Sequence, residues 1–134
     1  MTTEITITRA HWGEMLADVT AHLPYEACGI VSGRDGRSTQ VIPVTNFLKS
    51  QTAYRMDPQE QLAAFLALED QNWGLLAIYH SHPEGPQSPS PRDLSQAYYP
   101  DTVNLIWSLT DGTWQCRGYK IAKDTYAGVK FCVE

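Results

Sequence analysis

A continuous apolar run, Gly74-Leu75-Leu76-Ala77-Ile78-Tyr79, stands near the middle of the chain and leads directly into His80-Ser81-His82-Pro83. An apolar run without polar alternation predicts a strand that is covered on both faces. Residues 102–109 form a second apolar-rich run, which predicts a second strand of this kind. The predicted strands and helices follow one another in mixed order along the chain. We therefore expect an α/β (α+β) fold, with a central mixed sheet flanked by helices.

Capping and turn residues divide the rest of the chain into short elements. Thr8 and Asp57 are placed to cap helices over residues 9–22 and 58–71, and Ser90-Pro91 predicts a short helix that stops before Pro100. Asp35-Gly36 and Asp111-Gly112 predict tight turns between strands. The second helix is expected to bury Leu62, Phe65, Leu66 and Leu68 or their neighbours. The strands are expected over residues 4–8, 27–34, 38–45, 54–56, 74–79, 102–109, 113–121 and 128–133.

Length and composition indicate one ordinary globular domain over residues 1–134, with 43% hydrophobic and 19% charged residues. The net charge of −5 and the lack of a basic cluster argue against nucleic-acid binding. The three cysteines are widely spaced, which favours neither a disulfide framework nor a zinc knuckle. No signal peptide is apparent, and no apolar stretch is long enough to span a membrane, so we expect a cytoplasmic protein.

Two histidines at the end of the central strand form a candidate metal site. Side chains alternate along an extended chain, so His80 and His82 should point the same way, with Cα atoms roughly 6.5 Å apart. Two imidazoles at this spacing can bind one metal ion. Asp93 is the candidate third ligand, because a proline-rich and therefore stiff loop connects it to the histidines.

Two histidines and one carboxylate leave a coordination position open, as in catalytic rather than structural zinc sites. Hydrolysis also requires a general base, and Glu26 is the candidate because it precedes an otherwise apolar strand. Ser90 could donate a hydrogen bond to an oxyanion, although the same hydroxyl is suited to capping its helix.

These residues resemble the motif of the JAMM (MPN-plus, Mov34/PAD-1-like) metalloproteases, H-[S/T]-H-P-x(6)-S-x-x-D. Here the motif corresponds to His80-Ser81-His82-Pro83, six residues, and Ser90-Pro91-Arg92-Asp93. Residues 24–33, Pro-Tyr-Glu-Ala-Cys-Gly-Ile-Val-Ser-Gly, are similar to the upstream block of that family, which carries its glutamate.

The resemblance implies that His80, His82 and Asp93 bind Zn²⁺, that Glu26 is the general base and that Ser90 assists the oxyanion. It also implies a small, prokaryotic-type peptidase or isopeptidase. Its expected substrate is an amide bond after the C-terminal glycine of a ubiquitin-like or sulfur-carrier protein. One alternative is a non-catalytic, zinc-containing MPN module that binds proteins. A zinc deaminase is a weaker alternative, because the chain lacks the P-C-x-x-C segment of those enzymes.

Overall fold

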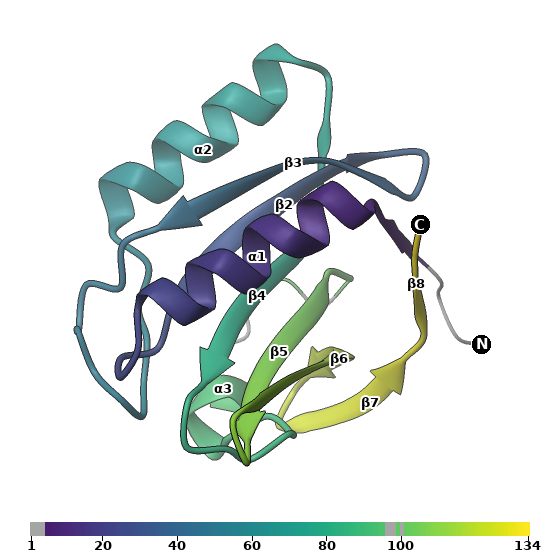
Figure 1. Cartoon of the computed structure of the whole chain (residues 1–134). Coiled ribbons are helices and arrows are strands. Elements are labelled where there is room, and N and C mark those ends of the chain that lie inside the picture. The colour runs from purple at the N-terminus through teal and green to yellow at the C-terminus, as the bar shows by residue number, and fades with distance from the viewer. Residues whose placement is uncertain (1–4, 96–98, 100) are drawn as a thin grey trace.

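The computed structural model describes residues 5–95, 99 and 101–134. In this part of the chain, eight strands form one mixed sheet in the order β7-β6-β5-β4-β2-β3-β1-β8 (Figure 1). The helices are α1 (Arg9–Ala21), α2 (Pro58–Asp70) and α3 (Pro91–Ser95). The strands are β1 (Ile5–Ile7), β2 (Cys28–Arg34), β3 (Arg37–Val44), β4 (Gly74–His82), β5 (Val103–Thr110), β6 (Thr113–Ala122), β7 (Thr125–Val129) and β8 (Phe131–Val133).

Both long helices begin at the residues that the sequence indicates. The Thr8 hydroxyl accepts a hydrogen bond from the backbone N–H of His11, and Asp57 accepts from the N–H groups of Gln59 and Glu60. Pro58 occupies the first turn of α2, where its missing N–H has no intrahelical partner to lose. These caps satisfy N–H groups that the helix itself leaves unpaired.

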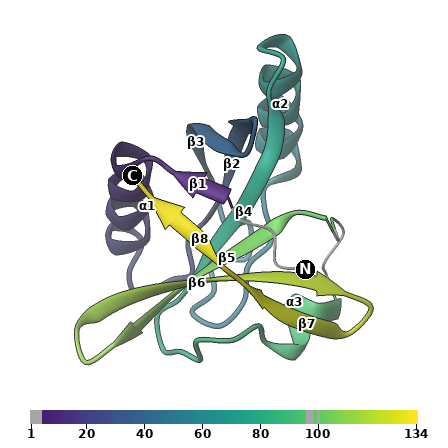
Figure 2. The same cartoon turned by 90° about the vertical axis from the view of Figure 1, so that its right-hand side faces the viewer.

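The central strands β2 and β4 are covered on both faces, which confirms the prediction made for β4. On one face, α1 packs through Met15 and Val19 in a core cluster that includes Tyr79. On the other face, α2 packs through Ala64 and Leu68 in a separate cluster. Figure 2 shows the two helices on opposite sides of these strands. Because side chains alternate along β4, Ile78, His80 and His82 belong to the face that α2 covers.

Two details of the predicted helices and strands are wrong. Leu62 and Leu66 are 60% and 56% exposed, whereas Leu68 is buried as expected, together with Ala64, and Phe65 packs against the same cluster. Residues 54–56 do not form a strand; only an isolated bridge joins Met56 to Asn46.

The single strand predicted over residues 128–133 is two strands that serve opposite edges of the sheet. β7 pairs antiparallel with β6, whereas β8 pairs parallel with β1. Only Lys130 separates them, so the sheet curls until its two edges meet there (Figure 2). The predicted end of the third helix before Pro100 lies outside the described residues. Among the described residues, no helix is long and apolar enough to cross a membrane.

Candidate metal centre and active site

The two histidines lie within β4 rather than beyond its end, because the strand continues to His82. Both side chains are buried, with 1% and 3% of their surface exposed. Their Nε2 atoms are 3.1 Å apart, as expected for residues two apart on one strand face. The strand thus presents two imidazole nitrogens to a single point.

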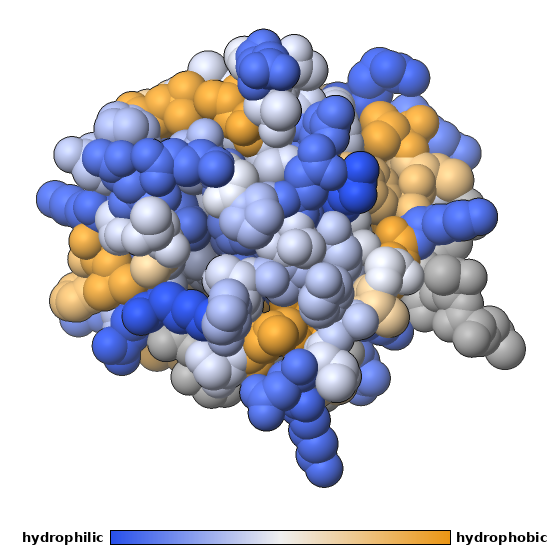
Figure 3. Space-filling model, turned by 90° about the horizontal axis from the view of Figure 1, so that it is seen from below, coloured by the Kyte–Doolittle hydropathy of each residue, from blue (hydrophilic) through white to orange (hydrophobic). Residues whose placement is uncertain are grey.

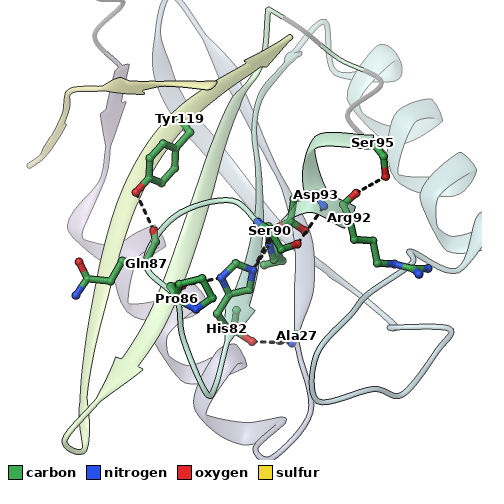
Figure 4. A network of polar contacts seen from close by, with 11 residues as sticks. Ala27, His82, Pro86, Gln87, Ser90, Arg92, Asp93, Ser95 and Tyr119 are labelled. Atoms are coloured by element: carbon green, nitrogen blue, oxygen red, sulfur yellow. Dashed lines mark hydrogen bonds and ion pairs between the residues drawn. The ribbon is translucent and has the colours of Figure 1, made fainter. Parts of the chain in front are cut away.

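Asp93, in the first turn of α3, brings a carboxylate oxygen to the same point. Its Oδ2 lies 3.3 Å from Nε2 of His80 and 3.1 Å from Nε2 of His82. The backbone N–H of Ser90 donates to the same Oδ2 at 2.8 Å, and the N–H of Asp93 donates to the Ser90 hydroxyl at 3.1 Å. This reciprocal pair resembles a capping box and fixes the carboxylate against the histidines (Figure 4).

The loop between the histidines and Asp93 is held at two further points. Nδ1 of His82 lies 2.7 Å from the Pro86 carbonyl, and the Tyr119 hydroxyl donates to the Gln87 carbonyl at 2.8 Å (Figure 4). A carbonyl only accepts, so Nδ1 of His82 carries the hydrogen. Its Nε2 in the neutral ring therefore presents a lone pair toward Asp93.

These three ligand atoms fit a tetrahedral metal ion. Two ligands about 2.0–2.1 Å from zinc, at the tetrahedral angle, are separated by about 3.3–3.4 Å. The sides of the triangle formed by His80 Nε2, His82 Nε2 and Asp93 Oδ2 measure 3.1, 3.1 and 3.3 Å. Without a cation, only a proton on Nε2 can link His82 to the Asp93 carboxylate; a divalent cation can take the place of that proton. The chemistry of the donor set therefore suits a bound divalent cation.

Glu26 reaches the same region through the pairing of β2 with β4. The two strands are antiparallel, with Cys28 opposite His80. Continuing this register, Glu26, two residues before Cys28, falls opposite His82, two residues after His80. Directly opposed residues share a face of the sheet. Ser81 extends the pairing beyond β2, because its Oγ accepts from the N–H of Ala27 at 2.8 Å. The register thus places Glu26 on the face of the histidines.

The loop after β3 secures the backbone of Glu26 from the other side. The Glu26 N–H donates to the Ser50 carbonyl at 2.8 Å. The amide Nδ2 of Asn46 donates to the Glu26 carbonyl at 3.1 Å. The carboxylate therefore projects from a backbone held at both its donor and its acceptor.

The side chain of Glu26 is buried but not satisfied. Only 3% of its surface is exposed, and Oε1 has no hydrogen-bond partner. Glu26, His80 and His82 form a buried group whose ligand atoms lie within 4.8 Å of one another. Burial raises the pKa of Glu26 to about 8, although the nearby His82 opposes this effect. A pKa near neutrality is what a residue that accepts and returns a proton requires.

Asp93 has the opposite electrostatic character. Burial by itself would raise its pKa, but the electrostatic interaction with His80 and the hydrogen bonds with His80, His82 and Ser90 outweigh burial. They hold the pKa of Asp93 well below its usual range, so it is ionised. The site thus holds one permanently charged carboxylate and one that can exchange a proton near neutral pH.

The structure therefore gathers all five residues singled out from the sequence, and it adds one that the sequence analysis missed. The ring of Tyr54 stacks on His80, with centroids 4.5 Å apart and an interplanar angle of 27°. Nδ1 of His80 has no hydrogen-bond partner, so the stack on Tyr54 orients this ring. The ring of His82 is oriented by the hydrogen bond of its Nδ1 with the Pro86 carbonyl. Tyr54 stands 26 positions before His80 in an irregular segment, where no sequence pattern indicates such a contact.

Comparisons with known proteins show which family the chain is similar to. Residues 8–117 match the family described as prokaryotic homologs of the JAB domain. A probable TtuB-protein conjugate cleaving protease of Thermus thermophilus is 47% identical over 103 residues, covering 73% of this chain and 68% of the relative. A CysO-cysteine peptidase of Mycobacterium tuberculosis is 37% identical over 110 residues, covering 80% of this chain and 75% of the relative.

Solved structures share the fold. Protein DSY2949 of Desulfitobacterium hafniense superposes with a TM-score of 0.86 at 36% identity, covering 97% of this chain and 92% of that one. AF2198 of Archaeoglobus fulgidus, a JAB1/MPN domain protein, gives a TM-score of 0.64 at 17% identity, covering 98% and 99%. The second likeness bears on the fold alone and confirms the expected α+β architecture of the JAB/MPN type. The chain belongs to the family of prokaryotic JAB-domain homologues and is a JAMM-type peptidase.

Proposed function

We propose that this chain is a zinc-dependent peptidase or isopeptidase that hydrolyses the amide bond after the C-terminal glycine of a ubiquitin-like or sulfur-carrier protein. The observation that carries the proposal is the buried carboxylate of Glu26, which has an unpaired oxygen beside the triangle of His80, His82 and Asp93. A buried, unsatisfied carboxylate costs stability. A protein that only binds partners has no use for it, whereas a hydrolase needs a base at this position.

His80, His82 and Asp93 would hold the metal, since their three ligand atoms match a tetrahedral site with one position left over. Two imidazoles and one carboxylate form a donor set that suits zinc. A bound zinc ion supplies Lewis acidity, which polarises a carbonyl and makes a water molecule acidic near neutral pH. The carboxylate of Asp93 remains ionised, so it contributes a full negative charge to this set.

Glu26 would accept the proton of the attacking water and return it to the leaving amine. Its pKa of about 8 reflects burial, and a cation beside it would lower that value toward neutrality. Both transfers then lie close to the operating pH.

The Ser90 hydroxyl has room for both roles assigned to it from the sequence. It accepts a hydrogen bond from the Asp93 N–H through a lone pair, which leaves its own hydrogen free. That hydrogen can be donated to the oxyanion that develops when the amide carbon is attacked. Capping and catalysis therefore use different parts of one hydroxyl group.

The substrate class is supported by the motif resemblance and by the described activities of the relatives. One relative is described as a probable TtuB-protein conjugate cleaving protease, and another as a CysO-cysteine peptidase. Both names describe a bond between a protein and a second group. We therefore place the scissile amide of this chain's substrate at the end of a small carrier protein.

The test compares a carrier fusion ending in Gly-Gly plus one further residue across wild-type and variant proteins loaded with zinc. Glu26→Gln should retain one zinc per chain and lose hydrolysis by about 10²–10⁴-fold, since general base catalysis contributes that much. Asp93→Ala should lose zinc as well as activity. Zinc retention by Glu26→Gln without loss of hydrolysis would exclude Glu26 as the base. A wild-type protein that binds zinc but cleaves no carrier fusion would favour the non-catalytic MPN module.

A further inference from the structure

A cavity of about 510 Å³ opens directly beside the candidate site and reaches from His80 and Asp93 to α2. Pro58 and Gln61 of α2 border it on one side, and Asn104 of β5 lines another part. This volume is within the range of pockets that bind small molecules or a peptide segment. A substrate bound for reaction at the site would therefore have part of its structure in this cavity.

Two arginines line the cavity, and in the part of the chain that the structure describes neither forms an ion pair. Arg55 and Arg92 are both exposed, and among the described residues the only arginine in an ion pair is Arg37, with Glu134. Arg92 is close enough to Glu26 to lower the pKa of that carboxyl. Figure 4 shows its guanidinium pointing away from Asp93. Its charge is thus available to a ligand.

The backbone under each arginine is fixed. The N–H of Arg55 donates to Oδ1 of Asn46 at 3.1 Å, and its carbonyl accepts from the N–H of Phe47 at 2.7 Å. The Arg92 carbonyl accepts from the Ser95 hydroxyl at 3.0 Å within α3. The two guanidinium groups therefore project from anchored positions rather than from free loops.

The charge of the cavity differs from that of the whole chain. The charged residues that line it are Arg55, Arg92 and Asp93, and Asp93 is already committed to the two histidines. This leaves two positive charges in a cavity of a protein whose net charge is −5. From below, the side on which β4 ends, the surface is largely hydrophilic, with hydrophobic side chains in small separate patches (Figure 3). Apolar and aromatic side chains, among them Tyr54, Met56 and Ile78, also line the cavity, so a ligand there would meet apolar contacts together with the two positive charges.

We propose that the cavity is a carboxylate-binding subsite, in which Arg55 and Arg92 pair with a carboxylate group of the substrate. This inference rests on the proposed function, since it assigns the cavity to the substrate of that reaction. Guanidinium groups form short, charge-assisted hydrogen bonds with carboxylates, and their planar geometry suits both oxygens.

Two parts of the substrate could supply this carboxylate. If a single amino acid is the leaving group, its free α-carboxylate lies next to the scissile amide. If the leaving group is the side-chain amine of a lysine within a protein, no free α-carboxylate is present. Alternatively, an acidic side chain in the carrier tail, just before Gly-Gly, could reach the same arginines. The two sources share one chemistry and can be separated with matched substrates.

The experiment uses zinc-loaded protein and two pairs of carrier fusions. In the first pair, one alanine follows Gly-Gly, as the free acid or as the carboxamide. In the second pair, the alanine is always a carboxamide, and the residue before Gly-Gly is Glu or Gln. We expect the charged member of one pair to have a kcat/KM about tenfold higher. The pair that shows this preference identifies the source of the carboxylate.

The preference should disappear in Arg55→Gln/Arg92→Gln. It should persist in the matched control Arg34→Gln, an exposed arginine at the end of β2. Thermal melting of each variant checks that the fold is intact. An absence of preference in both pairs, or a preference that the double variant keeps, would overturn the subsite.

Binding measurements separate this inference from the proposed function. Zinc-loaded Glu26→Gln should bind the charged member of the preferred pair about tenfold more tightly, and the added arginine changes should remove the difference. If no fusion is cleaved by the wild type but this arginine-dependent binding is seen, the proposed reaction is wrong and the subsite stands. Cleavage without any arginine-dependent preference would leave the reaction standing and refute the subsite.

Discussion

Gly29 gives the sharpest test of the strand pairing that brings Glu26 to the histidines. It lies on β2 directly opposite Tyr79 of β4, and opposed residues face the same side of a sheet. The Tyr79 side chain covers the space over Gly29: a Cβ there would lie 2.3–2.4 Å from two ring carbons and the hydroxyl oxygen. The Tyr79 hydroxyl in turn donates to Oδ2 of Asp18 on α1 at 2.7 Å. Gly29→Ala must therefore displace a fully buried ring.

The expected cost has two parts. Overpacking a well-filled core costs about 1–3 kcal/mol. Moving the ring also weakens a hydrogen bond to a carboxyl group, a further loss of about 1–3 kcal/mol. We therefore expect Gly29→Ala to lower the free energy of unfolding by about 4 kcal/mol. At about 2.1 cal/mol/K per residue, unfolding 134 residues gains roughly 0.28 kcal/mol/K. The melting temperature should then fall by about 14 °C.

Differential scanning calorimetry of the metal-free protein measures this change without a contribution from ligand binding. Gly13→Ala on α1 is the matched control, because nothing lies within 4 Å of its added Cβ. It should leave the melting temperature unchanged or raise it slightly. In Gly29→Ala/Tyr79→Leu, the smaller side chain makes room, so the double variant should be little worse than Tyr79→Leu alone. A Gly29→Ala protein that melts within 2 °C of wild type, or fully additive penalties, would refute this account.

Two further predictions concern residues around the site. Tyr54→Leu should weaken zinc binding by about 2–10-fold in competition with a chelator, since an aromatic stack contributes about 0.5–1.5 kcal/mol. Tyr54→Phe keeps the stack and should keep wild-type affinity. Equal affinities of both variants would contradict an orienting role for the stack on His80. Burial raises the pKa of the Cys28 thiol to about 12, so at pH 8 it remains protonated. Mass spectrometry should find Cys28 unmodified by iodoacetamide in the native protein and fully modified in denaturant; rapid native labelling would contradict its burial.

The fold was predictable where local chemistry decides the structure. Thr8 and Asp57 cap their helices as expected, because capping depends on a few neighbouring residues. Leu62 and Leu66 were wrongly expected in the core, because helical spacing fits more than one stripe and only the packing against β3 and β4 selects Ala64 and Leu68. The last strand divides into β7 and β8 because the curled sheet offers a partner at each edge, which is a long-range property.

The candidate site also combines features that local sequence predicts with features that only tertiary contacts determine. His80 and His82 face one point because alternation along a strand is local. Asp93, Glu26 and Ser90 were candidates from their places in the sequence, and the resemblance to a known motif supported them. No local rule states how closely Glu26 approaches the histidines. That approach depends on the register between β2 and β4. Tyr54 and Arg55 were missed for a related reason: they lie in an irregular segment whose path is set by tertiary contacts.

The register also explains why the two carboxylates of the site differ. Asp93 sits in the first turn of a helix, where Ser90 donates to it and both histidines face it, so its charged form is stabilised. Glu26 lies where β2 begins, buried by the strand pairing, and its Oε1 receives no hydrogen bond. Desolvation therefore dominates at Glu26, whereas at Asp93 the electrostatic interaction with His80 and the hydrogen bonds together outweigh desolvation. One carboxylate is suited to hold a cation and the other to move a proton, and the difference follows from the element that carries each.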